Sequence, residues 1–165
     1  MATSPDVKLR ELLEEFGLAM LVTRTPEGRL RARPMALAAV EADGALWFAT
    51  DRHSGKVEEL AHDSHAAVTM QSKTKFVSLS GTATTVDDKA KAAKLWKAEW
   101  KVWFPGGQDD PNLILLKLDG HTGEYWDNSG TSGIKYLIEA GKALLTGTRP
   151  NVGEDPKVNG KVELS

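Results

Sequence analysis

The sequence predicts a mainly β domain, an antiparallel barrel with helices at its periphery. Short apolar segments of strand character follow one another, about six or seven in all, and most are separated by turn clusters rich in Gly, Asp and Pro. Helical segments are inserted between strands rather than alternating with them, which argues against a doubly wound parallel sheet. The chain has 165 residues, 41% of them hydrophobic and 27% charged, as expected for one globular domain.

The composition excludes several classes of site. There is no cysteine, so disulfides, thiolate metal sites and cysteine nucleophiles are ruled out. The formal net charge is -2 at pH 7, which argues against a nucleic-acid partner. With only 4 histidines, the spaced pair His62 and His65 is better explained as a solvated helix end, and we expect no metal site. We find neither a targeting signal nor a run of about 20 apolar residues, so we expect a cytoplasmic protein without a membrane partner.

The N-terminal third predicts one helix and three strands. Residues 4–16 carry apolar side chains at helical spacing, and a Ser-Pro pair supplies the N-cap and a first-turn proline. Residues 18–24 form an apolar strand that ends in a Thr-Pro-Glu-Gly turn. Residues 29–40 are long enough for a strand with a break at Pro34, which cannot donate to a central ladder. An Asp-Gly hairpin signal precedes the returning strand at 45–50.

The middle of the chain predicts a short helix at 54–61 and strands at 66–71 and 76–86. A longer helix begins at the two acidic residues 87 and 88, which suit the positive end of a helix dipole. One stripe of that helix is expected to carry Ala92, Trp96, Trp100 and Trp103.

The C-terminal third predicts two further strands and a tail. Residues 113–118 and 123–127 have strand character, and the Asp-Gly-His-Thr sequence at 119–122 predicts a hairpin between them. We place the folded domain at residues 1–147. Residues 148–165 are rich in Pro, Gly, Asn and charge, and we expect an extended or flexible tail with little structure of its own.

Residues 46–57 form the most informative segment for function, since a strand leads through a polar loop into a helix. The N-terminus of a helix offers free N–H groups and a positive dipole end, which suit a phosphate. Arg52, Ser54 and Lys56 lie around this junction, although the spacing is not that of a Walker A loop. The alternative is an ordinary Ser N-cap with charges at the surface.

Arg31, Arg33 and Met35 form a second candidate, because alternation places all three on one face of a strand. Two guanidiniums that point into a barrel need partners. The alternative is an edge strand whose arginines lie in water.

Several short motifs occur in a fixed order between residues 9 and 126. They are Arg33-Pro34-Met35, Phe48-Ala49-Thr50-Asp51 with Ser54-Gly55-Lys56, Ser80-Gly81-Thr82-Ala83, Trp103-Phe104-Pro105-Gly106-Gly107 with Asp109-Asp110-Pro111, and Glu124-Tyr125-Trp126-Asp127. In this series the chain resembles the general stress protein 26 family of the pyridoxamine 5′-phosphate oxidase-like, FMN-binding split β-barrels.

The resemblance implies a six-stranded antiparallel split barrel that forms a homodimer and holds two FMN molecules in the clefts between subunits, with FAD as an alternative cofactor. Ser54 and Lys56 would hold the flavin phosphate, and Arg33 would approach the phosphate or the ribityl chain. The remaining cofactor-binding residues implied by the family pattern are Pro34 and Met35 along the isoalloxazine, Thr50 and Asp51 beneath the flavin, and Gln71 and Trp126 against the ring.

The function implied by the resemblance is that of a stress-related flavin oxidoreductase, with no catalytic residue assigned. The true oxidases carry a C-terminal Arg-Leu-…-Pro substrate motif, which the tail of this chain lacks, so oxidation of pyridoxamine phosphate is not expected. One alternative is a flavin-binding or carrier stress protein that turns nothing over. Another is a binder of heme or deazaflavin F420 on the same barrel.

The aromatic content bears on assembly. Large aromatic side chains are more numerous than one small barrel can enclose, and tryptophan is enriched at interface cores. We therefore expect part of this set to face a partner subunit: Trp47, Trp96, Trp100, Trp103, Phe104 and Trp126.

Overall fold

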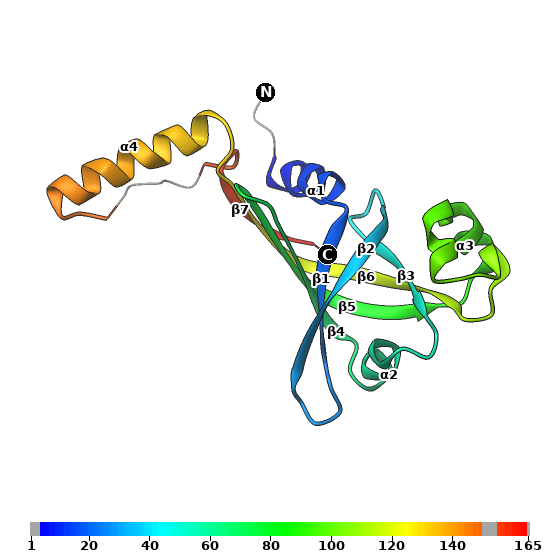
Figure 1. The fold of residues 1–165 in the computed structure, drawn as a ribbon. Helices are drawn as coiled ribbons and strands as arrows, with labels where there is room; N and C mark the ends of the chain where they lie inside the picture. The colour runs from blue at the N-terminus through cyan, green and yellow to red at the C-terminus, as the bar shows by residue number, and fades with distance from the viewer. Residues whose placement is uncertain (1–3, 150–154, 165) are drawn as a thin grey trace.

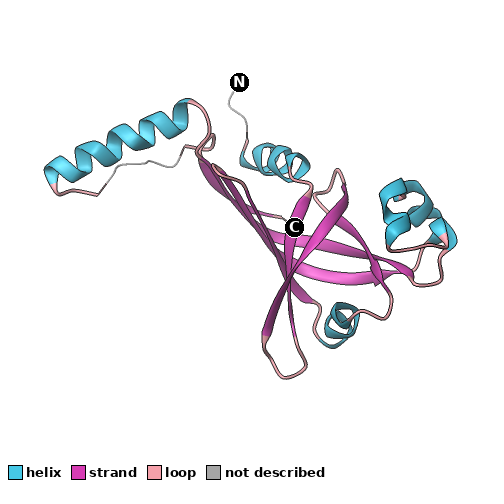
Figure 2. Ribbon diagram, in the orientation of Figure 1, coloured by secondary structure: helices cyan, strands magenta, loops and turns pink. Residues whose placement is uncertain are grey.

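The computed structural model describes residues 4–149 and 155–164; residues 1–3, 150–154 and 165 are not described. Six antiparallel strands run in the order β3-β2-β1-β4-β5-β6, and β6 pairs back onto β3, so the sheet closes into a barrel with helices at its periphery (Figures 1 and 2). This confirms the predicted fold class. The strands are β1 (Leu18–Arg24), β2 (Leu30–Val40), β3 (Leu46–Asp51), β4 (His65–Gln71), β5 (Lys75–Val86), β6 (Leu113–Asp127) and the added β7 (Asn159–Glu163).

Alternation along the strands fills the barrel with aliphatic side chains. Leu21, Phe48, Val68 and Leu79 come from four different strands, and each is fully or almost fully buried in one cluster. The helices at residues 5–15 and 55–62 close the barrel from opposite ends (Figure 1). The helices and 3₁₀ turns are α1 (Pro5–Glu15), α2 (Gly55–His62), α3 (Lys89–Leu95), η1 (Ala98–Val102), η2 (Gly107–Asp109) and α4 (Thr131–Thr146).

The expected break of β2 at Pro34 does not occur. Residues 30–36 pair with β1 in an unbroken register, and β2 meets β3 only from Leu37 onward. The Leu37 N–H donates to Gly17 on the β1 side, so alternation turns the nitrogen of Pro34 to the other side, where no strand pairs. The missing N–H of proline therefore leaves no ladder bond unmade.

β6 is one strand of 15 residues, so the predicted hairpin at 119–122 is wrong. Ser80 pairs with Thr122 while Gly81 pairs with Gly120, which leaves His121 as the extra residue of a β-bulge. A Cβ on Gly81 would lie 1.9 Å from the Asp119 carbonyl oxygen, so this close approach requires glycine. The Asp-Gly signal therefore marks a bend in a long strand rather than a turn.

The bend divides β6 between two partners. Its first half pairs with β3, and its second half pairs with β7. The expectation that the tail has little structure is therefore wrong at 159–163. The Tyr125 hydroxyl donates to the Pro156 carbonyl oxygen at 2.5 Å, which fixes the approach to β7. The boundary between a domain at 1–147 and a tail at 148–165 stays a prediction.

The helix expected from residue 87 is interrupted. α3 ends at Leu95, Trp96 adopts ψ 132, and the chain continues as the 3₁₀ turn η1. The interruption lets Trp100 and Phe104 pack over Trp47 on the outside of β3, in a second apolar cluster separate from the barrel core. Trp103, expected on the same stripe as Trp100, is instead 78% exposed.

α4 follows β6 and points away from the barrel (Figure 1). Gly130 precedes it at φ 65, and Gly147 ends it in the left-handed conformation at φ 68. Among the described residues, no helix has the combination of length and apolar character that crossing a membrane requires.

Candidate functional site

The end of β3 and the start of α2 gather two hydroxyls and an ammonium. Ser54 occupies the N-cap position of α2, but its side chain makes no capping hydrogen bond. Its Oγ instead lies 3.4 Å from Thr50 Oγ1, which also accepts from Lys56 Nζ at 2.9 Å. The ordinary N-cap interpretation therefore describes only the backbone of Ser54, because its hydroxyl contacts Thr50 rather than the N–H groups of the helix.

Among the described residues the Lys56 ammonium forms no direct ion pair, although Asp51 and Glu59 lie near enough to act on it. Burial, and then the nearby Arg33 guanidinium, lower the pKa of Lys56 below its usual value. Within 4–149 and 155–164, no carboxylate lies within salt-bridge distance of Lys56. A half-buried cation beside a helix N-terminus is a favourable place for an anion, because the anion would pair with it directly and accept from the first-turn N–H groups.

Arg33 points into the same end of the barrel, where a buried carboxylate meets it. Its Nη2 lies 2.6 Å from Glu59 Oε2 on α2, and its Nη1 donates to Thr23 Oγ1. Arg31 Nη1 reaches the second oxygen of Glu59 at 2.8 Å, and Thr23 Oγ1 donates to Glu59 Oε2 at 2.5 Å. Arg33 therefore has the partner that an inward orientation requires, whereas Arg31 is 61% exposed and reaches the same carboxylate from the surface.

Glu59 is ionised in this setting. Its burial would raise the pKa of the carboxyl, but hydrogen bonds from Thr23 and Arg33 outweigh burial and hold the pKa below its usual value. Glu59 is shared between Arg31 and Arg33, whereas Lys56 has no carboxylate in direct contact among the described residues, which leaves Lys56 as the better cation for a ligand. The sequence reasoning missed Glu59, and the only signal for it was an acidic residue beside Leu60 on the buried side of a short helix.

The other predicted residues of this region differ in their burial and contacts. Thr50 is buried at the barrel end, and Asp51 Oδ1 accepts from the His53 N–H at 2.7 Å to shape the loop. Met35 lies in the barrel core, whereas Pro34 next to it faces outward and is exposed. Their roles toward a flavin stay predictions.

Gln71 and Trp126 belong to a different region, on the outside of the barrel. The register joins them through Phe76, which pairs with Gln71 on one side and with Trp126 on the other. Thr50 pairs with Ile114, and Trp126 lies twelve residues further along β6, roughly 40 Å of strand at 3.3 Å per residue. The structure therefore does not bring Trp126 together with Lys56 within one chain.

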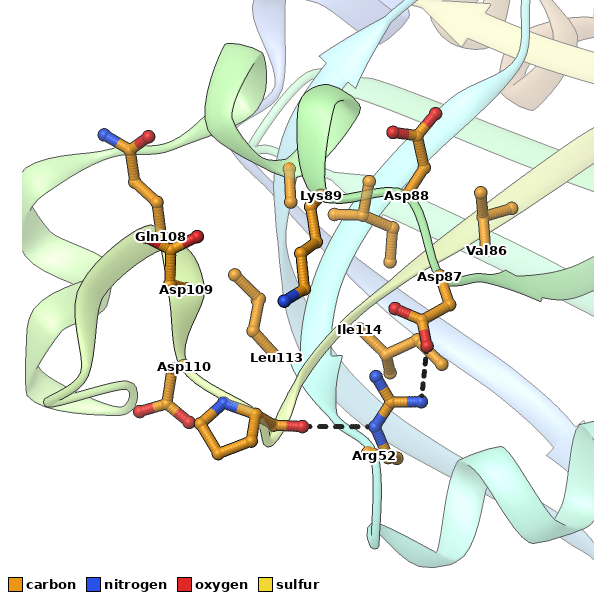
Figure 3. A pocket seen from close by; sticks show the side chains of 13 residues that line it. Arg52, Val86, Asp87, Asp88, Lys89, Gln108, Asp109, Asp110, Leu113 and Ile114 are labelled. Atoms are coloured by element: carbon orange, nitrogen blue, oxygen red, sulfur yellow. Dashed lines mark hydrogen bonds and ion pairs between the residues drawn. The ribbon is translucent and has the colours of Figure 1, made fainter.

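Arg52 is not part of the Lys56 cluster, although the sequence placed it at the same junction. Its Nε donates to the Pro111 carbonyl oxygen at 3.2 Å, and its Nη1 lies 2.9 Å from Asp87 Oδ2 (Figure 3). The side chain thus ties the loop after β3 to the segments on both sides of α3. Arg52 has a structural role here that sequence spacing could not separate from ligand binding.

A broad outer face of the barrel, formed by β2, β1, β4, β5 and β6, exposes apolar side chains. Leu18 and Met20 on β1 are 64% and 40% exposed, and Phe76 and Trp126 are 38% and 41% exposed. A groove on the same face is lined by small residues such as Ala67 and Ser80. We call the outer surface of these five strands the open face.

The fold defines a split-barrel protein, and the junction between β3 and α2 places Lys56 and two hydroxyls at one end of the barrel. The chain matches the family described as pyridoxamine 5′-phosphate oxidase like over residues 5–151. The chain belongs to this family.

The chain is similar to three proteins with more specific descriptions. A structure from Jannaschia sp. CCS1, provisionally assigned as a general stress protein 26, is 28% identical with a TM-score of 0.68, covering 94% of this chain and 96% of that one. The general stress FMN/FAD binding protein of Xanthomonas citri is 30% identical with a TM-score of 0.64, covering 74% of this chain and 88% of that one. Protein bli-3 of Neurospora crassa is 34% identical over 119 residues, which span 65% of this chain and 57% of bli-3.

Proposed function

We propose that this chain is an FMN-binding flavoprotein that works as a cytoplasmic homodimer, with a stress-related redox role. The observation that carries the proposal is the half-buried Lys56 ammonium, which forms no direct ion pair with the described residues and lies beside the Ser54 and Thr50 hydroxyls at the start of α2. The Xanthomonas citri relative, described as FMN/FAD binding, supports a flavin as the ligand. We expect FMN rather than FAD, because the terminal phosphate of FMN fits a helix N-terminus.

In this proposal the protein residues bind and orient the cofactor. Lys56 and Ser54 hold the phosphate, and Arg33, fixed by Glu59, lies close enough to add positive potential. When bound, the isoalloxazine supplies the electron chemistry. Residues 148–165 contain no Arg-Leu-…-Pro motif, so we do not propose a phosphorylated pyridoxamine as the substrate.

The separation of the predicted residues supports a site built by two chains. One flavin cannot span the stretch of β6 between Ile114 and Trp126, so Lys56 and Trp126 of the same chain cannot both contact it. A two-fold dimer through the open face would carry Trp126 and Gln71 of one protomer toward Lys56 of the other. It would also cover Leu18, Met20 and Phe76, which a monomer leaves in water.

Flavin titrations test the phosphate assignment. Lys56→Ala should weaken FMN binding by about 1.5–3 kcal/mol, the range for a hydrogen bond to a charged group. Riboflavin, which has no phosphate, should bind both proteins equally. Lys94→Ala, an exposed lysine on α3, is the matched control and should leave both affinities unchanged. Equal FMN affinity of the wild type and Lys56→Ala would refute the assignment.

A further inference from the structure

The helix α4 carries an apolar face that its own chain leaves exposed. At 100° per residue its large aliphatic side chains fall within an arc of about 120°, and the charged residues lie outside this arc. These are Lys135, Glu139 and Lys142, which form the polar side. Each large residue of the apolar arc is between 52% and 90% exposed: Ile134, Leu137, Ile138, Leu144 and Leu145. We call these five residues the α4 face.

Both ends of the segment that carries α4 are fixed to the barrel. Before the helix, Asp127 is buried, pairs with Lys8 at 2.7 Å and accepts from the Ser129 hydroxyl at 2.5 Å. After it, β7 pairs with β6, and the Asp127 N–H donates to the Val158 carbonyl oxygen at 2.5 Å. Figure 1 shows α4 extending outward from this base. The residues before and after α4 are therefore fixed to the barrel, while the helix itself extends away from it.

The size of the α4 face indicates an extension of a larger interface. A helix of 16 residues is about 24 Å long, and a strip about 10 Å wide along it covers about 240 Å². A stable interface buries about 800 Å² on each partner. The face alone is too small, so a partner would cover it only together with a larger surface. Its first residue, Ile134, lies eight residues after Trp126, which is on the open face that the proposed dimer covers.

The charges of α4 argue against a lipid surface as the occupant. Helices that lie on membranes carry many Lys and Arg residues on the polar side. In α4, Lys142 is paired with Glu139 at 2.9 Å, which leaves Lys135 as the remaining charge among the described side chains of the helix.

We propose that the α4 face packs against a second copy of the chain, so that helix α4 of each protomer lies against the other protomer. This inference rests on the homodimer of the proposed function. The second copy also offers apolar surface to meet it, since Val102 and Trp103 beyond α3 are each 78% exposed.

Thiol labelling tests this directly, because the natural chain contains no cysteine. Leu137→Cys and Leu144→Cys place single thiols on the α4 face, and Lys142→Cys places one on the polar side of the same helix. Each variant is labelled at several protein concentrations, and its mass is measured by sedimentation in the same buffer. FMN absorbance is recorded on the same samples.

At a total chain concentration ten times the dimer dissociation constant, about one fifth of the chains are monomeric, so the thiols of the α4 face should react about fivefold more slowly than in the dissociated protein. Dilution should remove this protection, and the Lys142→Cys thiol should react quickly throughout. Fast labelling of both α4-face thiols in a protein that sediments as a dimer and binds FMN would contradict the packing of α4 on the partner and leave the proposed function intact. Protection in a monomer, or protection only with anionic vesicles, would assign the face to its own chain or to lipid and would also overturn it. FMN-free monomers with fast labelling would contradict both proposals.

Discussion

Glu59 organises the candidate site although it is not expected to touch a ligand. One carboxylate on α2 receives Arg31, Arg33 and the Thr23 hydroxyl, each from a different position on β1 or β2. The barrel end is thus joined to the helix that carries Ser54 and Lys56. A change at Glu59 should therefore affect both stability and the position of Arg33.

We predict that Glu59→Gln destabilises the fold by about 3 kcal/mol, near the lower end of the cost of breaking a buried ion pair, because Arg31 is mostly exposed. Glu58→Gln, a neighbour on the same helix, is the control and should change stability little. Because the folded-state pKa of Glu59 is lowered, its contribution is present above the unfolded pKa and is lost as the pH falls through the folded pKa. Denaturant melts from pH 7 downward should show the two proteins converging in acid; a constant difference would contradict this origin.

Lys56 gives a second prediction at the residue scale. Its pKa is lowered in the free protein, mainly by burial, and a bound phosphate dianion would raise it. FMN affinity should therefore fall as the pH rises through the free-state pKa of Lys56, which is below that of an exposed lysine. Lys56→Arg keeps the charge at alkaline pH and should remove this dependence.

Isothermal titrations of FMN between pH 7 and 10 on both proteins measure the difference. Ionisation of the flavin ring enters both titrations equally, so only the difference between the proteins reports on Lys56. Parallel pH profiles would show that the ammonium does not meet the phosphate.

At the scale of the elements, local patterns predicted most of the strands and the first two helices. Alternation located β5, and the Ser-Pro pair located the start of α1. The failures at 119–122 and 159–163 have a common cause, since long-range strand pairing decided both. The Asp-Gly pair at 119–120 became a bulge because β6 is held against β5 on both sides of it. β7 formed because the exposed edge of β6 was available to a polar segment without a strand pattern.

The site shows the same division between local and long-range information. Ser54 and Lys56 were predictable because they lie close together in sequence at one helix start. Glu59 as the partner of Arg33 was not, because the pairing depends on how α2 closes the barrel. The structural role of Arg52 was missed for the same reason, since Asp87 and Pro111 reach it from distant segments.

The bulge in β6 yields a prediction about an element. Gly81→Ala would place a Cβ 1.9 Å from a backbone oxygen that cannot move without disturbing the ladder. We expect a loss of about 3 kcal/mol or more, at the upper end for overpacking. Gly17→Ala is the control, since a Cβ there would meet no atom within 4 Å and the backbone of Gly17 is not in the left-handed region. Urea midpoints compare the two; a Gly81→Ala midpoint equal to that of the wild type would mean that the bulge can relax at no cost.

At the scale of the whole molecule, the residues implied for flavin binding fall at two distant places on one barrel. Ser54 and Lys56 lie at the start of α2, and Trp126 lies near the end of β6, shortly before α4. Figure 1 shows α2 and α4 at distant places on the barrel. The open face runs between these places and leaves Leu18 and Met20 in water. A dimer through this face accounts for both the exposure and the separation, and it makes the cofactor a link between the chains. FMN should therefore stabilise the dimer against dilution.

Mixing two binding-defective variants tests the shared site most directly. Lys56→Ala and Trp126→Ala homodimers should each bind FMN weakly at both sites, and Trp126 is exposed enough for its variant to fold. After the chains exchange, half of the dimers are mixed, and each mixed dimer has one intact site of its two. FMN titration of the mixture should then recover wild-type affinity at about one quarter of the sites. If each flavin were bound by a single chain, the mixture would recover no high-affinity site, and the shared cleft would be contradicted.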